Sequence, residues 1–143
     1  VASIMRIVDE LESSADAVYN IMIILKRKKS KKVEFPKPSK NELTPYLELV
    51  DQFLVFIRDH LEHPMTDGDL AEAVSMEKKI NKMRKSCRKS ARKRLQDGSE
   101  VRAELMYIDI VRHIEHIGDY ALNIAEAIRE SEGQLQHAPV EQA

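Results

Sequence analysis

Apolar residues follow a helical period over most of the chain. In the first stretch they stand at alternating steps of four and three, the spacing of one face of an amphipathic helix. This apolar stripe consists of Ile4, Val8, Leu11, Ala15, Val18, Met22 and Leu25. We predict a helix over residues 1–28. It ends in a basic run, and Pro36 and Pro38 then forbid its continuation.

The next two helices are predicted from their start signals. Thr44-Pro45 pairs a capping hydroxyl with a proline suited to the first helical turn, so we predict a helix over 44–62. Thr66 and Asp69 have the spacing of a capping box, and they predict the start of a helix over 66–97.

A fourth helix is predicted over 99–130, after the turn residue Gly98. Its apolar stripe consists of Ile110, Ile114, Ile117, Ala121, Ile124 and Ile128. We expect one domain over residues 1–131 and a flexible tail over 132–143. Because the connections are short, the predicted fold class is all-α, an antiparallel up-down bundle of four long helices.

Composition supports a helical domain. The 143 residues are 43% apolar and 33% charged, and only four are Gly, as expected where little chain forms turns. A lone cysteine, Cys87, excludes an internal disulfide and favours the cytosol. The apolar stretch from Ile21 to Leu25 is too short to cross a bilayer. Because Val1 already stands within the helical period, we expect the chain to be a piece of a longer polypeptide.

An acidic pattern, Glu-x-x-x-Asp-x-x-x-Asn-Ile, occurs twice. Residues four apart are neighbours on a helix, so each copy forms a ridge of oxygen-bearing side chains. The first ridge consists of Glu12, Asp16 and Asn20, and the second consists of Glu115, Asp119 and Asn123. Adjacent carboxylates repel each other, and carboxylate and amide oxygens suit a hard cation such as Mg, Ca, Mn or iron. The alternative is a solvated acidic face.

Histidines give little support to a redox or zinc site. A di-iron bundle carries Glu-x-x-His on two helices, and no acidic residue of this chain has a histidine three positions later. His113 and His116 flank Glu115, but a three-residue spacing without further ligands is weak evidence for zinc. We interpret both as surface or supporting histidines.

The stretch from Glu115 to Glu126, which reads EHIGDYALNIAE, closely resembles the signature ERIGDHAxNIAE of PhoU-type phosphate-uptake regulators. The resemblance implies two three-helix repeats with acidic motifs that hold multinuclear iron or zinc clusters, and a role in restraining phosphate transporters. In that frame, residues 1–28 look like the closing helix of a first repeat whose front is missing. The remaining three helices look like a complete second repeat.

The resemblance also indicates candidate metal ligands. The family places an acidic motif in the middle helix of each repeat, and the corresponding residues here are Glu77 and Asn81. Asn81 replaces an expected Asp and removes a charge, which weakens cation affinity. The candidate metal ligands are Glu115, Asp119, Glu77, Asn81, Glu12 and Asp16.

The truncated arrangement is similar to the C-terminal region of bacterial sodium/phosphate cotransporters, which carry a PhoU-like domain after their membrane part. This resemblance implies a position on the cytoplasmic side, tethered to the inner membrane through a missing transporter segment. The expected partners are the membrane domain of a phosphate transporter and further copies of the chain.

The segment from Lys78 to Arg94 carries ten Lys or Arg residues and no acid. Such a face is solvated, binds anionic lipid headgroups or meets acidic ridges on another subunit. The candidate contact residues are Lys78, Lys79, Lys82, Lys85, Arg88, Lys89 and Arg92. Nucleic-acid binding is not expected, because no aromatic residues interleave the basic ones.

An enzyme is not expected, because the chain lacks a glycine-rich phosphate loop and a nucleophile with a base at fixed spacing. The sequence thus predicts a regulatory or interaction domain that controls phosphate transport. Two alternatives remain: a metal-binding bundle without a transporter role, and a module that binds nucleic acid or anionic surfaces through Lys78–Arg94.

Overall fold

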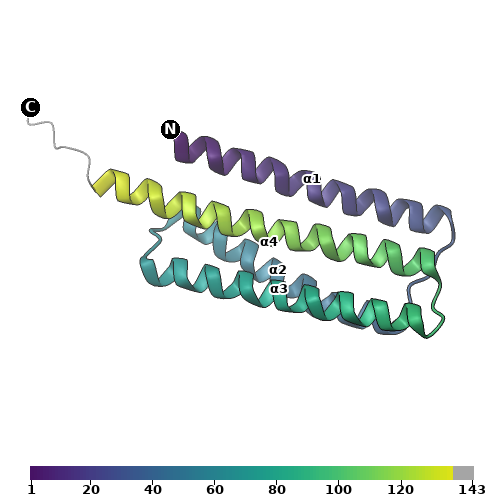
Figure 1. The fold of residues 1–143 in the computed structure, drawn as a ribbon. Helices are drawn as coiled ribbons and strands as arrows, with labels where there is room; N and C mark the ends of the chain where they lie inside the picture. The colour runs from purple at the N-terminus through teal and green to yellow at the C-terminus, as the bar shows by residue number, and fades with distance from the viewer. Residues whose placement is uncertain (137–143) are drawn as a thin grey trace, which may run out of the picture.

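The computed structural model describes residues 1–136 as four helices without strands. They are α1 (Ala2–Ser30), α2 (Lys37–Glu62), α3 (Asp67–Gln96) and α4 (Val101–Gln136). Consecutive helices run in opposite directions (Figure 1). The prediction of an all-α, antiparallel up-down bundle is therefore confirmed. No helix within residues 1–136 combines the length and the hydropathy needed to span a bilayer.

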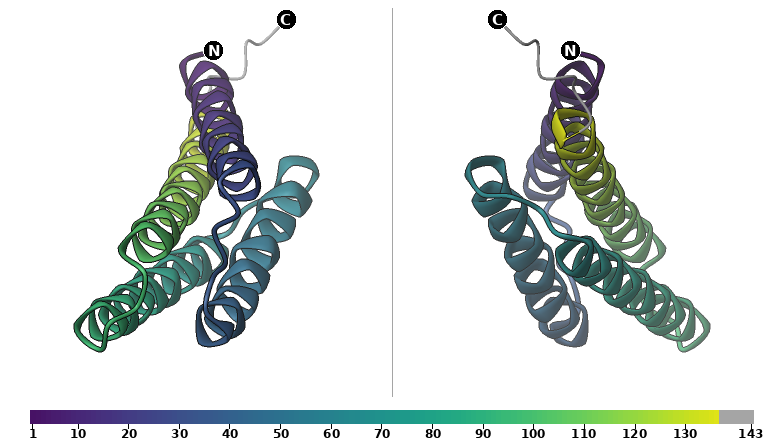
Figure 2. Two further views of the ribbon diagram at one scale, coloured as in Figure 1. Left: turned by 90° about the vertical axis from the view of Figure 1, so that its right-hand side faces the viewer. Right: turned by 90° about the vertical axis from the view of Figure 1, so that its left-hand side faces the viewer.

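The four helices do not all contact one another. Helices α2, α3 and α4 pack against one another, whereas α1 contacts α4 alone. Figures 1 and 2 show α1 lying along α4, with α4 between α1 and the other two helices. The molecule is thus a three-helix bundle with a fourth helix added on one side.

Helix α4 is central because it is apolar on more than one side. All six residues of its predicted stripe are buried. On the side of α2 and α3, the core contains Tyr46, Phe53, Ile80 and Tyr107, none of which exposes measurable surface. Burying such large side chains stabilises the fold by roughly 1.5–3 kcal/mol each. The bundle of α2, α3 and α4 therefore has a core that does not require α1.

The predicted start of α2 at residue 44 is wrong. The helix begins at Lys37, after Pro36 as the capping residue, and Pro38 lies in the first turn, where no backbone N–H is needed. Pro45 lies inside the helix. The Thr44 hydroxyl donates to the carbonyl of Lys40 at 3.3 Å instead of capping a helix start. Pro36 and Pro38, which were expected to prevent continuation of the first helix, thus also mark the start of the second.

The capping box that begins α3 is confirmed. The Asp69 amide donates to the Thr66 hydroxyl at 3.1 Å, and the Thr66 amide donates to the Asp69 carboxylate at 2.9 Å. Gly98, with a φ of 93°, adopts the left-handed conformation that ends a helix.

The end of α4 differs from the prediction. Both carboxylate oxygens of Glu132 lie 2.8 Å from the backbone amide of Met65, in the connection between α2 and α3. This contact anchors the last turns of α4, which continues to Gln136. The prediction of a flexible tail is therefore wrong for residues 132–136, and residues 137–143 lie outside the described residues.

The apolar stripe of α1 does not face α4. Its large side chains, from Ile4 to Leu25, are each 42–64% exposed. The residues of α1 that are buried are Ser3, Ala17 and Ile24, on a neighbouring face. An amphipathic stripe ordinarily faces the protein core. In α1 it faces away from every other helix that the structure describes.

Candidate functional site

The second acidic ridge and the middle-helix motif meet between α3 and α4. Asp119 and Glu77 are hydrogen-bonded through their side chains, and the Asn81 amide donates to Glu77. Glu115 lies close enough to raise the pKa of Asp119. The structure therefore brings Glu77, Asn81, Glu115 and Asp119 together, and we call these four residues the acidic cluster.

Gly118 allows the close approach of α3 and α4 at this cluster. A methyl group on Gly118 would lie 3.1 Å from two side-chain carbons of Ile80, which is fully buried on α3. A larger residue would push the helices apart because packed interiors leave little free space. The glycine that precedes Asp119 thus has a packing role in forming the acidic cluster.

Arg84 provides positive charge beside the acidic cluster. Its guanidinium lies 3.0 Å from the Glu115 carboxylate, and the two side chains are only 21% and 14% exposed. Sequence reasoning assigned Arg84 only to the basic segment. The spacing along α3 could have indicated this position. Glu77, Asn81 and Arg84 follow one another at steps of four and three, so they share one face of the helix.

The pKa of Asp119 is raised from 3.8 to about 6. Partial burial is the largest cause, followed by the negative charges of Glu115 and Glu77. Burial and like charge both disfavour the ionised carboxyl. Protonated Asp119 can donate a hydrogen bond to Glu77, and this bond is lost when Asp119 ionises near pH 6.

Tyr46 of α2 is buried within reach of the charges of Glu115 and Asp119. Its hydroxyl donates to the Val111 carbonyl at 3.2 Å, and burial, followed by the charge of Glu115, raises its pKa. The phenol thus remains neutral and acts as a fixed hydrogen-bond donor within the bundle.

The acidic cluster does not form a ready-made metal centre. Within residues 1–136, no group of three or more His, Cys, Asp or Glu side chains is arranged to hold a metal ion. Arg84 already pairs with Glu115. One feature favours a cation, because Oδ1 of Asn81 is buried without a hydrogen-bond partner. The metal assignment stays a prediction.

The first acidic ridge has different surroundings. Glu12 and Asp16 are exposed on α1, which packs only against α4, so no middle helix lies beside them. Asp16 and Asn20 line a small groove of about 160 Å³ whose α4 side consists of His113, His116 and Tyr120. Burial, followed by the charge of Arg112, lowers the pKa of His113. The two ridges are therefore not equivalent sites.

The predicted contact residues of α3 form an exposed basic face. Lys78, Lys79, Lys82, Lys85, Lys89 and Arg92 are exposed and Arg88 is half-buried, and none of them forms an ion pair with an acidic residue within 1–136. This basic face is therefore available to an anionic partner.

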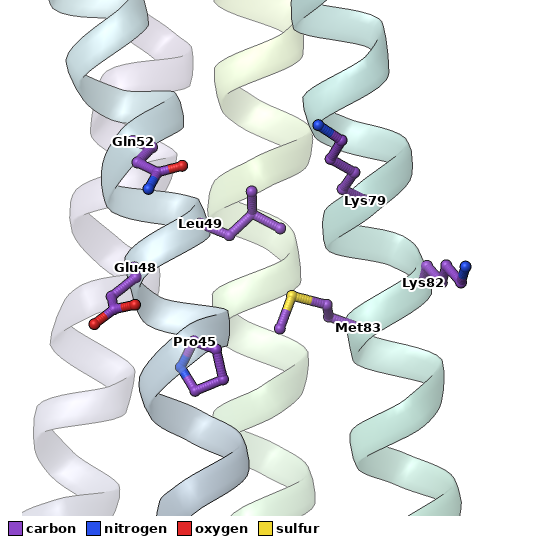
Figure 3. A pocket seen from close by; sticks show the side chains of 7 residues that line it. All are labelled: Pro45, Glu48, Leu49, Gln52, Lys79, Lys82 and Met83. Atoms are coloured by element: carbon purple, nitrogen blue, oxygen red, sulfur yellow. The ribbon is translucent and has the colours of Figure 1, made fainter.

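A groove of about 370 Å³ borders the basic face. In Figure 3, Leu49 of α2 and Met83 of α3 point toward each other between the two helices, while Lys82 points away. The other lining residues are Pro45, Glu48, Gln52 and Lys79. Because the lining combines apolar and charged side chains, the groove suits a peptide or another helix better than a small anion.

A buried charged network lies at the other end of α3. Arg94 contacts both oxygens of Glu104 at 2.8 and 3.1 Å and both oxygens of Glu42 at 3.3 and 3.2 Å. Tyr107 donates to Glu42 at 2.6 Å, and Ser99 donates to the fully buried Glu104 at 2.9 Å. Sequence reasoning missed this network, although an acid among the apolar residues that begin α4 is a recognisable signal.

The family model of the PhoU domain matches residues 57–128. The chain belongs to the PhoU family. The matched segment runs from the end of α2 through α3 and most of α4, and it contains the whole acidic cluster. Membership of this regulatory family indicates a phosphate-related regulatory role. No curated protein and no solved structure matches the chain.

Proposed function

We propose that this PhoU-family domain controls phosphate transport by binding the cytoplasmic side of a phosphate transporter, to which the longer polypeptide tethers it. The observation that carries the proposal is the family match over the segment that builds the acidic cluster. The partner class is the membrane region of a sodium/phosphate cotransporter. The domain acts by binding the transporter, and its charged surfaces recognise this partner.

The basic face of α3 is the proposed contact surface. Its side chains carry charge that no acid within residues 1–136 neutralises. Each basic residue near an anionic membrane surface contributes about 1 kcal/mol of attraction. A domain held beneath a transporter therefore gains affinity from headgroups and from acidic cytoplasmic loops together.

Co-purification tests the contact. The domain is mixed with the membrane region of a bacterial sodium/phosphate cotransporter in nanodiscs that contain anionic lipid. We expect retention of the domain, and we expect weaker retention after Lys78→Gln, Lys82→Gln, Lys85→Gln and Lys89→Gln are combined. A matched control replaces four lysines outside α3, at positions 29, 31, 32 and 37. Equal retention on nanodiscs without transporter would contradict a transporter-specific contact.

Metal-dependent regulation is the second candidate function. The crowded carboxylates and the unpaired Oδ1 of Asn81 favour a hard cation at the acidic cluster. Its binding requires Arg84 to leave Glu115 and Asp119 to lose its proton. The cation would then replace the guanidinium as the positive charge between α3 and α4.

A further inference from the structure

A continuous groove runs along α2 and α3. The groove of about 370 Å³ beside the basic face and a neighbouring hollow of about 300 Å³ share Pro45 and Met83 as lining residues. Together they extend along α2 from Asn41 to Gln52, which is about 16 Å or three helical turns. This length is sufficient for a short helical segment, and we call the whole feature the α2–α3 groove.

The α2–α3 groove opens away from the other two helices. In Figure 3, α4 and α1 lie behind α2 and α3, and the groove lies in front of them. Helix α1 contacts α4 and neither α2 nor α3. A preceding family repeat would join the bundle through α1. The groove is therefore on the far side of the bundle from that junction.

The floor of the α2–α3 groove is apolar. Leu49 and Met83 are half-buried and point toward each other between the helices (Figure 3). Pro45 lies one turn before Leu49, and the buried Cys87 lies one turn after Met83. Methionine is unbranched and adapts its shape to a partner. Apolar residues one turn apart on each helix suit an amphipathic helix with anchors at steps of three and four.

Charge differs between the two sides of the α2–α3 groove. On α3, Lys79 and Lys82 line the groove and belong to the basic face, which forms no ion pair with an acid within residues 1–136. On α2, the polar lining residues are Glu48 and Gln52. An occupant with acidic side chains toward α3 is attracted, and one with basic side chains there is repelled.

A helix fits the α2–α3 groove better than other occupants. A bilayer surface is flat, whereas Leu49 and Met83 lie between two helices. An extended peptide binds by adding to the edge of a sheet, and residues 1–136 form no strand. A helix in the groove would pack on one side of the α2–α3 pair as α4 packs on the other, by side-chain ridges that enter grooves.

We propose that the α2–α3 groove binds an amphipathic helix of a partner protein, with Asp or Glu residues along the flank that faces α3. The apolar face of this helix contacts Leu49 and Met83, and its acidic flank pairs with Lys79 and Lys82. This inference goes beyond the proposed function, because it does not require the partner to be a transporter.

Selection from a peptide library tests the proposal. The library displays peptides of about 14 residues, or about four helical turns, with leucine at alternating steps of three and four and all other positions randomised. Selection on the full chain should enrich peptides that carry Asp or Glu along one flank of the leucine stripe. Enrichment of basic flanks, or no enrichment above a library with serine in place of leucine, would overturn the proposal.

Methionine signals locate the enriched peptide. The chain has six methionines, and labelling their methyl groups with carbon-13 gives a signal for each in NMR spectra. Binding in the α2–α3 groove should shift the signal of Met83 most. Met5 and Met22 are 63% and 61% exposed on α1, and their signals should not move. Shifts at Met5 and Met22 without a shift at Met83 would place the peptide on α1 and contradict the proposed site.

Charge reversal tests the acidic flank. Lys79→Glu combined with Lys82→Glu should weaken binding of the enriched peptide at least about tenfold, because like charges then face each other. A matched control combines Lys78→Glu with Lys85→Glu, which makes the same change of charge on exposed residues of α3 that do not line the groove. The control should bind the peptide more tightly than the groove variant. Equal affinities of the two variants would overturn the proposal.

Discussion

Arg84 of α3 and Glu115 of α4 form an ion pair at 3.0 Å, at the place where the family resemblance led us to expect a metal cation. The pair joins the two helices that build the acidic cluster. It supplies positive charge to a group of carboxylates that otherwise repel one another. We therefore expect the ion pair to contribute to the stability of the α3–α4 contact.

Removal of Arg84 should destabilise the protein. Arg84→Met leaves Glu115 half-buried without its partner, and we expect a loss of about 2 kcal/mol in the free energy of unfolding, as for hydrogen bonds to charged groups. Urea denaturation followed by circular dichroism measures this loss. Lys85→Met, on the exposed face of α3, should change the free energy by less than about 0.5 kcal/mol. Equal effects of the two changes would contradict the role of the ion pair.

Asp119 should make stability depend on pH. Its pKa is raised from 3.8 to about 6 in the folded protein, so folding favours the protonated form. The resulting stabilisation is complete below about pH 4 and is lost as the pH rises through 6. Asp119→Asn should therefore become more stable relative to wild type between pH 4 and about 6.5. Thermal unfolding across this range measures the difference, with Asp51→Asn on α2 as the control for loss of a surface charge.

Metal binding, if it contributes to regulation, should depend on the same two groups. Affinity for Mn²⁺ should fall about tenfold for each pH unit below 6, because protons compete for Asp119. Arg84→Gln should strengthen binding, and Glu115→Gln with Asp119→Asn should abolish it. Isothermal titration with Mn²⁺ and elemental analysis of the purified protein measure these effects. If Arg84→Gln also fails to bind any metal, the metal proposal is wrong, whereas the transporter proposal is unaffected.

The network around Arg94 should be a strong determinant of stability. Arg94→Met leaves the fully buried Glu104 without its cation, which typically costs about 3–5 kcal/mol. The double variant Arg94→Met with Glu104→Leu should recover part of this loss, because no uncompensated charge remains buried. A double-mutant cycle by urea denaturation measures the coupling. Additive losses would show that the two residues act independently.

Helix identity and the main core could be predicted from the sequence because they depend on local signals. The stripe of α4 and the capping box at Thr66 follow directly from residue spacing, and the structure confirms both. The start of α2 was predicted too late because two start signals compete. Pro36 and Pro38 are suited to a first helical turn as much as Thr44-Pro45 is, and the structure uses the earlier pair and keeps Pro45 inside the helix.

The acidic cluster could be predicted only in part. The spacing of Glu115 and Asp119 indicated one ridge, and the family resemblance indicated Glu77 and Asn81. The role of Arg84 depends on which side of α3 faces α4, and charge counting does not reveal it. Likewise, the apolar stripe of α1 indicated a packing face but not its partner, since α4 uses the neighbouring face.

The proposal that this domain controls phosphate transport is tested most directly by uptake of radiolabelled phosphate into proteoliposomes. The vesicles contain the membrane region of a sodium/phosphate cotransporter, and the domain is added on the cytoplasmic side under a sodium gradient. We predict that the domain changes the initial uptake rate, and that combined Lys→Gln changes on the basic face of α3 abolish the effect. An uptake rate that is the same with and without the domain would contradict the proposed function.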